Sequence, residues 1–335
     1  TRVDDTMTLP PALHQHAERE PSRAALPEAP LTIERALAIA LANNPDVVSD
    51  GWEIEAAQAR KRQASSGHWP ALDIHAAYRH HWHKERLVPA RGQGVAASFS
   101  HDVFAGDVVL TVPLFSGGRV MGAIEAADLL ARAAGKKLAR TREELVFDVK
   151  STFYAILGQE RLIGAIEHSR KALTEHRQKT LHLIEARKAA RVDLLNIEVR
   201  LADLDHRLVK QRGMVKLHEC LLLSLLGVEA APPGGLVLEG DLAPHESLPG
   251  RAKLRAAAVE SRADLLQLDL EIEAQARRVD TARAAYWPLV SVKGTYGPRL
   301  SIKGEYDDPG FAGLELVMPV FTGFRIPARV EEEQA

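Results

Sequence analysis

The chain repeats itself 218 residues apart, and this duplication constrains its fold more than any other feature. The segment DVVSDGWEIEAAQARKRQASSGHWPALDIHAAY at 46–78 recurs as DLLQLDLEIEAQARRVDTARAAYWPLVSVKGTY at 264–296. A second marker follows each copy, VPLFSGG at 112–118 and MPVFTGF at 318–324, at an offset of 206. A long unit duplicated in tandem predicts an architecture built from two equivalent halves.

Composition narrows the class of protein. The 335 residues include 43 basic and 45 acidic ones, so the formal charge of −2 creates no basic field that favours nucleic acid. Aromatic residues make up 5% and charged residues 26%, a profile closer to long helices than to a compact all-β core. The lone Cys220, in the apolar run CLLLSLLG, is predicted to be a small buried hydrophobe. The sequence shows neither a signal peptide nor an 18-residue apolar stretch, as in a mature exported protein or a cytosolic one.

The first helices can be placed from caps and prolines. Residues 1–30 carry five prolines and no apolar period, so we expect an extended or disordered leader. A helix is predicted to begin after Thr32, which is a suitable N-cap. It should stop at Asn44-Pro45, because proline disfavours a helical conformation in the residue before it. A second helical run covers 46–67.

Strand-like periodicity begins at the Trp-Pro pairs. Apolar residues alternate with polar or small ones over 72–82 and again over 290–296, which predicts two strands, each with one apolar face. Return strands are predicted at 107–115 and 312–321. Four amphipathic strands cannot close a barrel, and an open sheet leaves two edges unpaired. This arrangement therefore indicates that several chains share one barrel.

A proline-free stretch between Pro113 and Pro232 predicts very long helices. A turn at 187–193 would join two antiparallel helices, the first of about 65 residues and roughly 100 Å. Heptads in the second helix indicate a coiled-coil seam, although a helix in an ordinary bundle shows the same pattern. The seam positions are Leu194, Ile197, Leu201, Leu204, Leu208, Gln211, Val215, His218, Leu222 and Leu225, and the second copy has its own series at Ala258, Leu265, Ile272, Val279 and Tyr286.

Taken together, these segments resemble the TolC-like outer membrane efflux proteins. The resemblance covers 31–330 and rests on LTIERALAIALANNPDV, HWPALDI, YWPLVSV, VPLFSGGR, MPVFTGFR and ARKAARVDLLNIEVRLADL. It implies a mainly α chain with a small β part: a long coiled-coil helical hairpin plus four amphipathic strands that contribute to a shared trimeric β-barrel. The barrel would lie in the outer membrane and the helices in the periplasm.

The resemblance also implies a function and partners. The chain would be the passive exit duct of a tripartite efflux or type I secretion system. Its partners would be two further copies, a periplasmic adaptor, an inner-membrane pump and outer-membrane lipid, with no nucleic acid. The cargo, whether drug, metal ion or protein, is not indicated.

The duplication and the resemblance together divide the chain into three parts. After the leader at 1–30 we expect a first repeat at 31–246 and a second repeat at 247–335. The second repeat is expected to be incomplete, because the chain ends about ten residues into the helical hairpin that the family carries there. At the tip of the first hairpin Ala189 and Ala190 stand where the family usually has a glycine, which raises the cost of a left-handed turn.

Few residues are candidates for a site. At the hairpin tip Arg191, Val192 and Asp193 fit adaptor docking, while Asp193 also fits the capping of the helix that follows. Histidines near the first strand suit zinc, copper or nickel, but no cysteine or well-spaced carboxylate completes a set, so a polar wall or loop role is favoured and no metal site is predicted. These histidines are His68, His75, His80, His81 and His83. Trp69, Trp82 and Trp287 fit a membrane interface, or, for Trp69 and Trp287, packing at a helix–strand junction.

Catalytic motifs are not found. The sequence has no glycine-rich phosphate loop, no HExxH and no GxSxG, so neither an enzyme nor a cofactor is predicted. The alternative function is that of a soluble or periplasmic coiled-coil scaffold or adaptor. It would explain the heptads, but not the duplicated Trp-Pro strand openers or the paired VPLF and MPVF markers.

Overall fold

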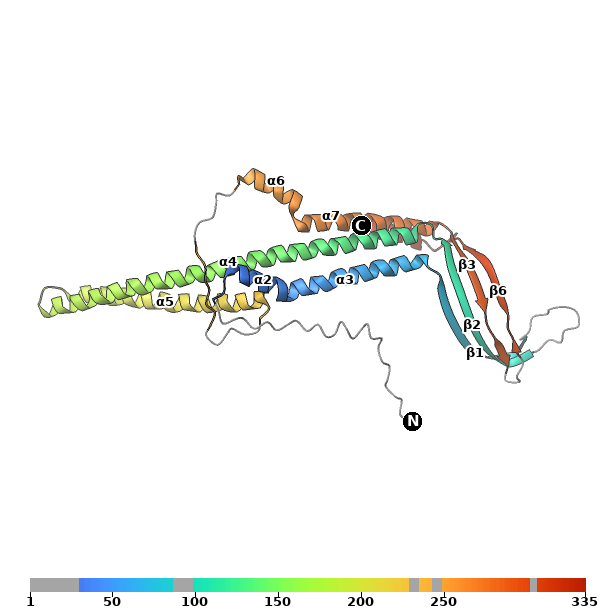
Figure 1. Ribbon diagram of the computed structural model, residues 1–335, viewed down its shortest axis with the longest axis horizontal. Coiled ribbons are helices and arrows are strands. Elements are labelled where there is room, and N and C mark those ends of the chain that lie inside the picture. Colours follow the sequence, from blue (N-terminus) through green and yellow to red (C-terminus); the bar gives the residue numbers. More distant parts are fainter. Residues whose placement is uncertain (1–29, 87–98, 229–234, 243–248, 302–305) are drawn as a thin grey trace, which may run out of the picture. The chain divides into compact units, whose positions relative to one another are not determined.

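The computed structural model describes residues 30–86, 99–228, 235–242, 249–301 and 306–335 (Figure 1). The predicted leader therefore lies outside the described residues, apart from Pro30. Contacts group the chain into two compact units. Unit 1 comprises 1–52 and 137–262, and unit 2 comprises 53–136 and 263–335.

Two pairs of helices repeat with equal lengths. The first pair is α2 (Ile33–Asn43) and α3 (Pro45–Ser65), and the second is α6 (Arg251–Ser261) and α7 (Ala263–Arg283). Each pair ends in a one-turn 3₁₀-helix, η1 (Ser66–His68) or η2 (Ala284–Tyr286). Every boundary recurs at the offset of 218 seen in the sequence. As predicted, Thr32 caps α2, because its Oγ1 accepts the Arg35 N–H at 3.4 Å.

A long helical hairpin follows the first strand pair. It consists of α4 (Arg119–Glu185), whose 67 residues span about 100 Å, and α5 (Arg191–Leu226). The predicted seam is confirmed, because every heptad residue of α5 is buried or half-buried. Ion pairs across the hairpin, Arg177–Glu198 at 2.9 Å and Arg170–Asp205 at 2.5 Å, flank this seam.

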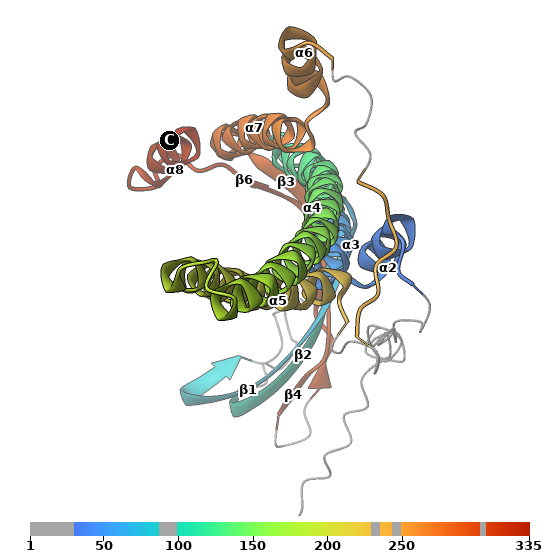
Figure 2. The ribbon, with the colours of Figure 1, turned by 90° about the vertical axis from the view of Figure 1, so that its left-hand side faces the viewer.

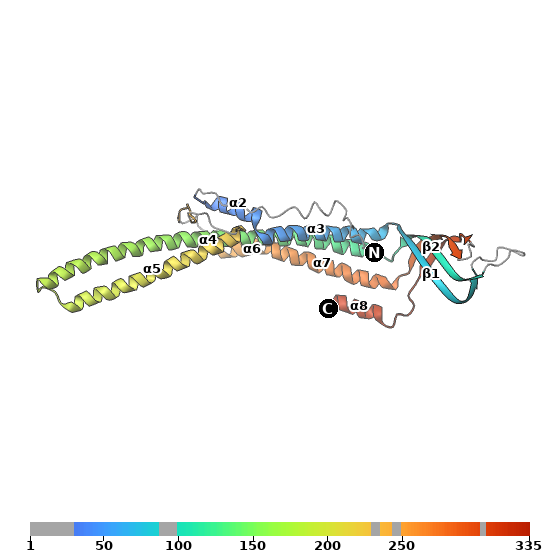
Figure 3. The same ribbon diagram turned by 90° about the horizontal axis from the view of Figure 1, so that it is seen from below.

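The core of unit 1 lies where the base of this hairpin meets α2 (Figure 3). Phe153 and Ile156 of α4 and Leu222 and Leu226 of α5 are fully buried there. A strap of residues 235–242 crosses the same core. It is tied down at Leu31, whose N–H donates to the Val237 carbonyl at 2.8 Å and whose carbonyl accepts the Glu239 N–H at 3.0 Å.

The sheet of unit 2 is antiparallel throughout. Its segments are β1 (Ala71–Arg86), β2 (Phe99–Phe115), β3 (Leu289–Tyr296), β4 (Arg299–Ser301), β5 (Tyr306–Asp307) and β6 (Gly310–Val317). On the same edge of β2, Tyr296 pairs with Val108 and Arg299 with Ala105, so β3 and β4 keep one register. The β5–β4 and β6–β3 pairings also share a register. The sheet therefore consists of four continuous strands, as predicted, two of them kinked.

The kink between β3 and β4 depends on a glycine. The Gly106 N–H donates to the Pro298 carbonyl at 3.0 Å, which brings Gly297 against the backbone of β2. A Cβ on Gly297 would lie 1.7 Å from the Gly106 carbonyl oxygen, so no other residue fits without moving a strand.

In unit 2 the helices follow the order of the strands (Figure 2). The start of α4 lies between α3 and α7, with Lys61–Asp128 at 2.6 Å on one side and Arg277–Glu125 at 3.4 Å on the other. The last helix, α8 (Arg325–Gln334), lies beside α7, where the Gln275 amide donates to the Glu333 carbonyl at 2.7 Å.

Two sequence predictions are wrong. Cys220 is exposed rather than buried, because it occupies the outward f position of the α5 heptad, between His218 and Leu222. The second heptad series is not a seam either. The break at Arg262 separates Ala258 from the rest of that series, and Ile272 is 69% exposed.

Candidate functional site

One face of the sheet is apolar and exposed. Along β1 and β2 it presents Leu72, Ile74, Tyr78, Phe104, Val108 and Leu110, and along the other strands Tyr296, Leu300, Leu314 and Leu316. Ile74 is 79% exposed and Leu314 is 74% exposed, so none of the segments that the structure describes covers this face. A contiguous apolar face of this size marks a surface in contact with lipid or with another protein.

The opposite face is polar. It carries Asp73 and His75 on β1 and two cross-strand ion pairs elsewhere. Arg299 reaches Asp107 at 2.8 Å across the kink, and Lys293 lies 3.8 Å from Glu315. Strands that alternate apolar and polar in this way form the wall between lipid and a water-filled lumen in membrane barrels.

The two edge strands each have a partner on one side only. β1 pairs with β2, and β6 pairs with β3, within the residues described. The return strand predicted at 312–321 ends at Val317, whereas the equivalent VPLF residues 112–115 belong to β2. Residues 112–115 extend β2 because they pair with β3, whereas the pairing of β6 with β3 ends at Val317.

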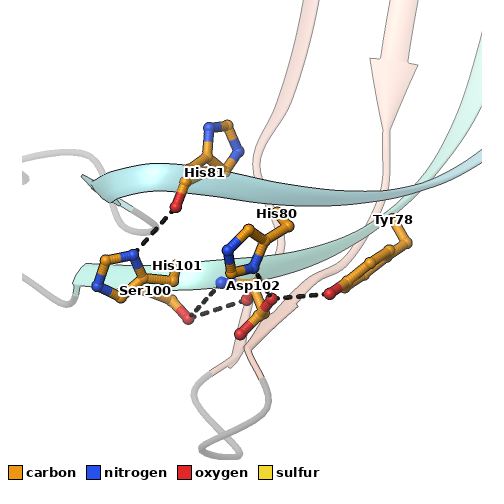
Figure 4. Close-up of polar contacts among 6 residues, drawn as sticks. All are labelled: Tyr78, His80, His81, Ser100, His101 and Asp102. Carbon is orange, nitrogen blue, oxygen red and sulfur yellow. Dashed lines mark hydrogen bonds and ion pairs between the residues drawn. The ribbon is translucent and has the colours of Figure 1, made fainter.

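A polar cluster lies at the far end of the apolar face (Figure 4). Asp102 of β2 accepts a hydrogen bond from the Tyr78 hydroxyl at 2.8 Å and lies 2.6 Å from His80 Nδ1. Just beyond it the register of β1 against β2 shifts, and His101 Nδ1 donates to the His81 carbonyl at 3.0 Å. Asp102 is thus satisfied by two neighbours at the edge of an otherwise apolar surface.

Two of the histidines singled out in the sequence, His80 and His81, belong to this cluster. His80 and His81 lie at the register shift with His101, whereas His75 lies farther along the strand on the polar face. Within the described ranges, no three His, Cys, Asp or Glu side chains are placed to hold a metal ion. The roles of Asp102 and His101 were missed, because they depend on the pairing of β1 with β2 rather than on any local motif.

The two Trp-Pro openers have the same structural context. Trp69 (φ −92°, ψ 153°) and Trp287 (φ −82°, ψ 152°) each follow a 3₁₀-helix and donate their N–H to the residue three before them. Both side chains, and that of Trp82, are exposed, as a membrane interface requires. The Trp287 Cβ also lies against Gly117, where a Cβ would approach it to 2.5 Å.

At the hairpin tip the turn is made by an unexpected residue. The left-handed position is Arg187 (φ 63°), not Ala189 or Ala190. The Lys188 N–H donates to the Leu183 carbonyl at 2.7 Å, which closes the end of α4. Asp193 accepts the Ala190 N–H at 3.2 Å, which is consistent with the capping interpretation of this residue. Arg191 and Val192 are exposed beside it.

The middle of the hairpin seam is polar. Gln211 Oε1 and His218 Nδ1, at two d positions, and Gln159 Oε1 of α4 are buried without a hydrogen-bond partner within the described structure. Partial burial raises the pKa of Glu160, and the nearby Glu219 carboxylate raises it further. This part of the seam therefore holds α4 and α5 together less strongly than the leucines on either side.

No helix among the described residues is both long enough and apolar enough to cross a membrane.

These features, a sheet with one apolar and one polar face joined to a long helical hairpin, are typical of a wall segment of a membrane duct. The family model described as outer membrane efflux protein matches residues 36–228. The chain belongs to this family. Its strands lie in the outer membrane and its helical part in the periplasm, and its function is efflux through a duct.

Solved structures share the fold. The CusC transmembrane channel is 15% identical, with a TM-score of 0.73 over 90% of this chain and 68% of CusC. VceC of Vibrio cholerae is 17% identical, with a TM-score of 0.72 over 90% of this chain and 72% of its own. The Campylobacter jejuni CmeC channel is 14% identical, with a TM-score of 0.74 over 90% of this chain and 64% of its own. The chain thus spans about two thirds of the length of these structures. Comparison with curated proteins gave no match.

The comparisons decide between the two functions that the sequence left open. The outer-membrane duct is confirmed over the soluble scaffold, and the family is one of transport ducts rather than of enzymes.

Proposed function

We propose that three copies of this chain assemble into one barrel, which passes cargo outward when an adaptor and an inner-membrane pump engage the helical hairpin. The observation that carries the proposal is the sheet with one apolar face, one polar face and two edges that no other described strand covers. The backbone N–H and C=O groups at a strand edge find no hydrogen-bond partner in lipid. The outer edges of β1 and β6 therefore need strands from other copies. We propose that the chain contributes through two repeats, 31–246 and 247–335.

The repeat supplies the register of the contact between copies. Inside the chain, β2 of the first repeat pairs with β3 of the second, with Leu110 opposite Gly294. The residue equivalent to Leu110 in the second repeat, 206 positions later, is Leu316. The residue equivalent to Gly294 in the first repeat, 218 positions earlier, is Ala76. The same offsets carry the β1–β2 pair Leu72–Leu110 onto the β3–β6 pair Val290–Leu316, which supports their use. We therefore expect Leu316 of one copy to lie opposite Ala76 of the next.

Cysteine crosslinking tests this arrangement. In a Cys220→Ser background, Leu316→Cys with Ala76→Cys should give a covalent trimer after mild oxidation in membranes, because directly paired strand residues have the Cα separation of a disulfide. Leu314→Cys with Ala76→Cys, two residues out of register, is the matched control. An intramolecular link is excluded, since β2 and β3 lie between the two edge strands. Equal crosslinking by the control pair would reject the register, and a product limited to dimers would reject the trimer.

We also propose that the exposed tip residues Arg191, Val192 and Asp193 contact the periplasmic adaptor. Val192→Asp changes the surface and leaves the Asp193 cap in place, whereas Asp193→Ala removes the cap. Both variants should assemble in the membrane. If the tip docks the adaptor, Val192→Asp loses crosslinking to the adaptor while it retains conductance in planar bilayers. Undiminished crosslinking by Val192→Asp would reject the assignment.

A further inference from the structure

A cavity of about 980 Å³ lies in unit 2, where the strands of the second hairpin meet their helices. Its apolar wall consists mainly of Trp287, Pro288, Met318 and Val330, the last from α8. A cavity of this volume is within the range of small-molecule and lipid sites.

The cavity continues the apolar face of the sheet. Leu289 pairs with Val317 at the end of β3 and β6, and Pro288 and Met318 are the residues next to this last pair. The pair Val290–Leu316, on the other side of Leu289, belongs to the apolar face, and alternation places Pro288 and Met318 on that same side. An acyl chain lying on the apolar face therefore leads into the cavity at the end of the strands where the helices begin.

The polar lining carries one charge of each sign. Arg283 of α7 and Glu331 of α8 both line the cavity, as does Tyr286 of η2. Arg283 approaches Asp280 only to 3.9 Å, and both side chains are more than half exposed, so the guanidinium is loosely held. A guanidinium binds phosphate oxygens with paired hydrogen bonds, and a carboxylate binds an ammonium group.

We propose that this cavity binds one phospholipid of the periplasmic leaflet, with a zwitterionic aminoethyl phosphate headgroup. Arg283 holds the phosphate, Glu331 holds the ammonium group, and an acyl chain lies along Trp287, Pro288 and Met318. The proposal rests on the proposed function, because only a sheet inserted in the membrane brings its helix-side end to that leaflet. A tyrosine and a tryptophan at the same level agree with this depth.

Lipid binding to the purified full chain in detergent tests the proposal. After delipidation, native mass spectrometry measures retention of phosphatidylethanolamine and of phosphatidylglycerol with the same acyl chains. We expect the wild type to retain the ethanolamine lipid preferentially. Arg283→Ala should weaken the binding of both lipids by at least about tenfold, because it removes a charge-assisted hydrogen bond to the phosphate. Glu331→Gln should weaken the binding of phosphatidylethanolamine alone. It should therefore abolish the preference for this lipid over phosphatidylglycerol.

Matched controls lie on the same two helices but outside this cavity. Arg278→Ala and Glu332→Gln change the same charges, and we expect both to bind lipid as the wild type does. A wild type with no preference between the two lipids, or an Arg278→Ala variant that loses lipid as Arg283→Ala does, overturns the proposal. The crosslinked trimer is a separate result: a chain that forms it and retains no lipid rejects the lipid site alone.

Discussion

Asn44 and Arg262, 218 positions apart, interrupt their helix pairs with the same backbone conformation. Their φ and ψ angles are −60° and 127° at Asn44 and −59° and 121° at Arg262. Each donates its N–H to the residue four positions earlier, Ala40 or Ala258, at 2.8 Å and 3.1 Å. The two copies have thus kept a helix break although the residue that makes it differs.

Asn44 has a further role in the first copy. Its side chain is buried, accepts the Asp46 N–H at 2.9 Å, and donates to the Leu225 carbonyl at the end of α5 at 3.1 Å. We expect Asn44→Ala to lower the free energy of unfolding by about 1–3 kcal/mol, since it removes a cap and takes a hydrogen-bond donor from the partly buried Leu225 carbonyl. Thermal unfolding followed by circular dichroism in detergent measures this. Asn43→Ala leaves the cap intact, and an equal loss in both variants would contradict the assignment.

The hairpin seam gives a second prediction, about packing. Leu208 is 6% exposed and its neighbour Val209 is 70% exposed. Leu208→Ala should cost about 2–5 kcal/mol of unfolding free energy, because it leaves a cavity between α4 and α5. Val209→Ala removes a side chain of similar chemistry from the surface and should change stability by less than about 0.5 kcal/mol. Equal midpoints for the two variants would mean that the seam does not hold the hairpin together.

Local sequence patterns predicted most of the elements. Thr32, Asn44-Pro45 and the Trp-Pro pairs act within a few residues, so caps, breaks and changes of period could be located without a structure. The duplication then fixed which elements are equivalent. Features that depend on pairing across a loop were missed. Asp102 is tied to Tyr78 and His80 only through the register of β1 and β2, and the apolar alternation does not specify that partner.

The left-handed residue of the hairpin tip and the exposure of Cys220 were also not predicted from local sequence patterns. The sequence indicated that the tip needs a left-handed residue, but the hydrogen bonds of the last α4 turn place it at Arg187 rather than at the alanines. The outward position of Cys220 follows from the heptad, although the apolar run around it suggested burial. In both cases the geometry of the helix, rather than the residue types around the position, decides the outcome.

The glycine markers after the two hairpins give a third prediction. Gly117 and Gly118 are left-handed (φ 64° and 88°), and so are their equivalents Gly323 and Phe324 (φ 60° and 63°). A left-handed non-glycine residue costs about 1–2 kcal/mol, so we expect Phe324→Gly to increase protection of the α8 amides in hydrogen exchange. Gly118→Ala should decrease the protection of the amides at the start of α4. The cause would be backbone strain alone, because a Cβ at this position meets nothing within 4 Å. Unchanged exchange in both variants would rule out strain at these positions.

Glu160 gives the last prediction, about pH. Burial and the Glu219 carboxylate raise the pKa of Glu160 in the folded chain. The folded state therefore binds the proton more tightly than the unfolded state does. The stabilising contribution of protonated Glu160 is fully present below the pKa of the unfolded chain, near 4.3. It is lost as the pH rises through the pKa of the folded chain. Glu160→Gln removes the charge, so we expect a higher thermal midpoint at pH 7 and no change at pH 4. Glu175→Gln, which makes the same change elsewhere on α4, is the control and should leave both midpoints unchanged. A gain at pH 7 that persists at pH 4 would show that the effect comes from packing rather than from the carboxylate charge.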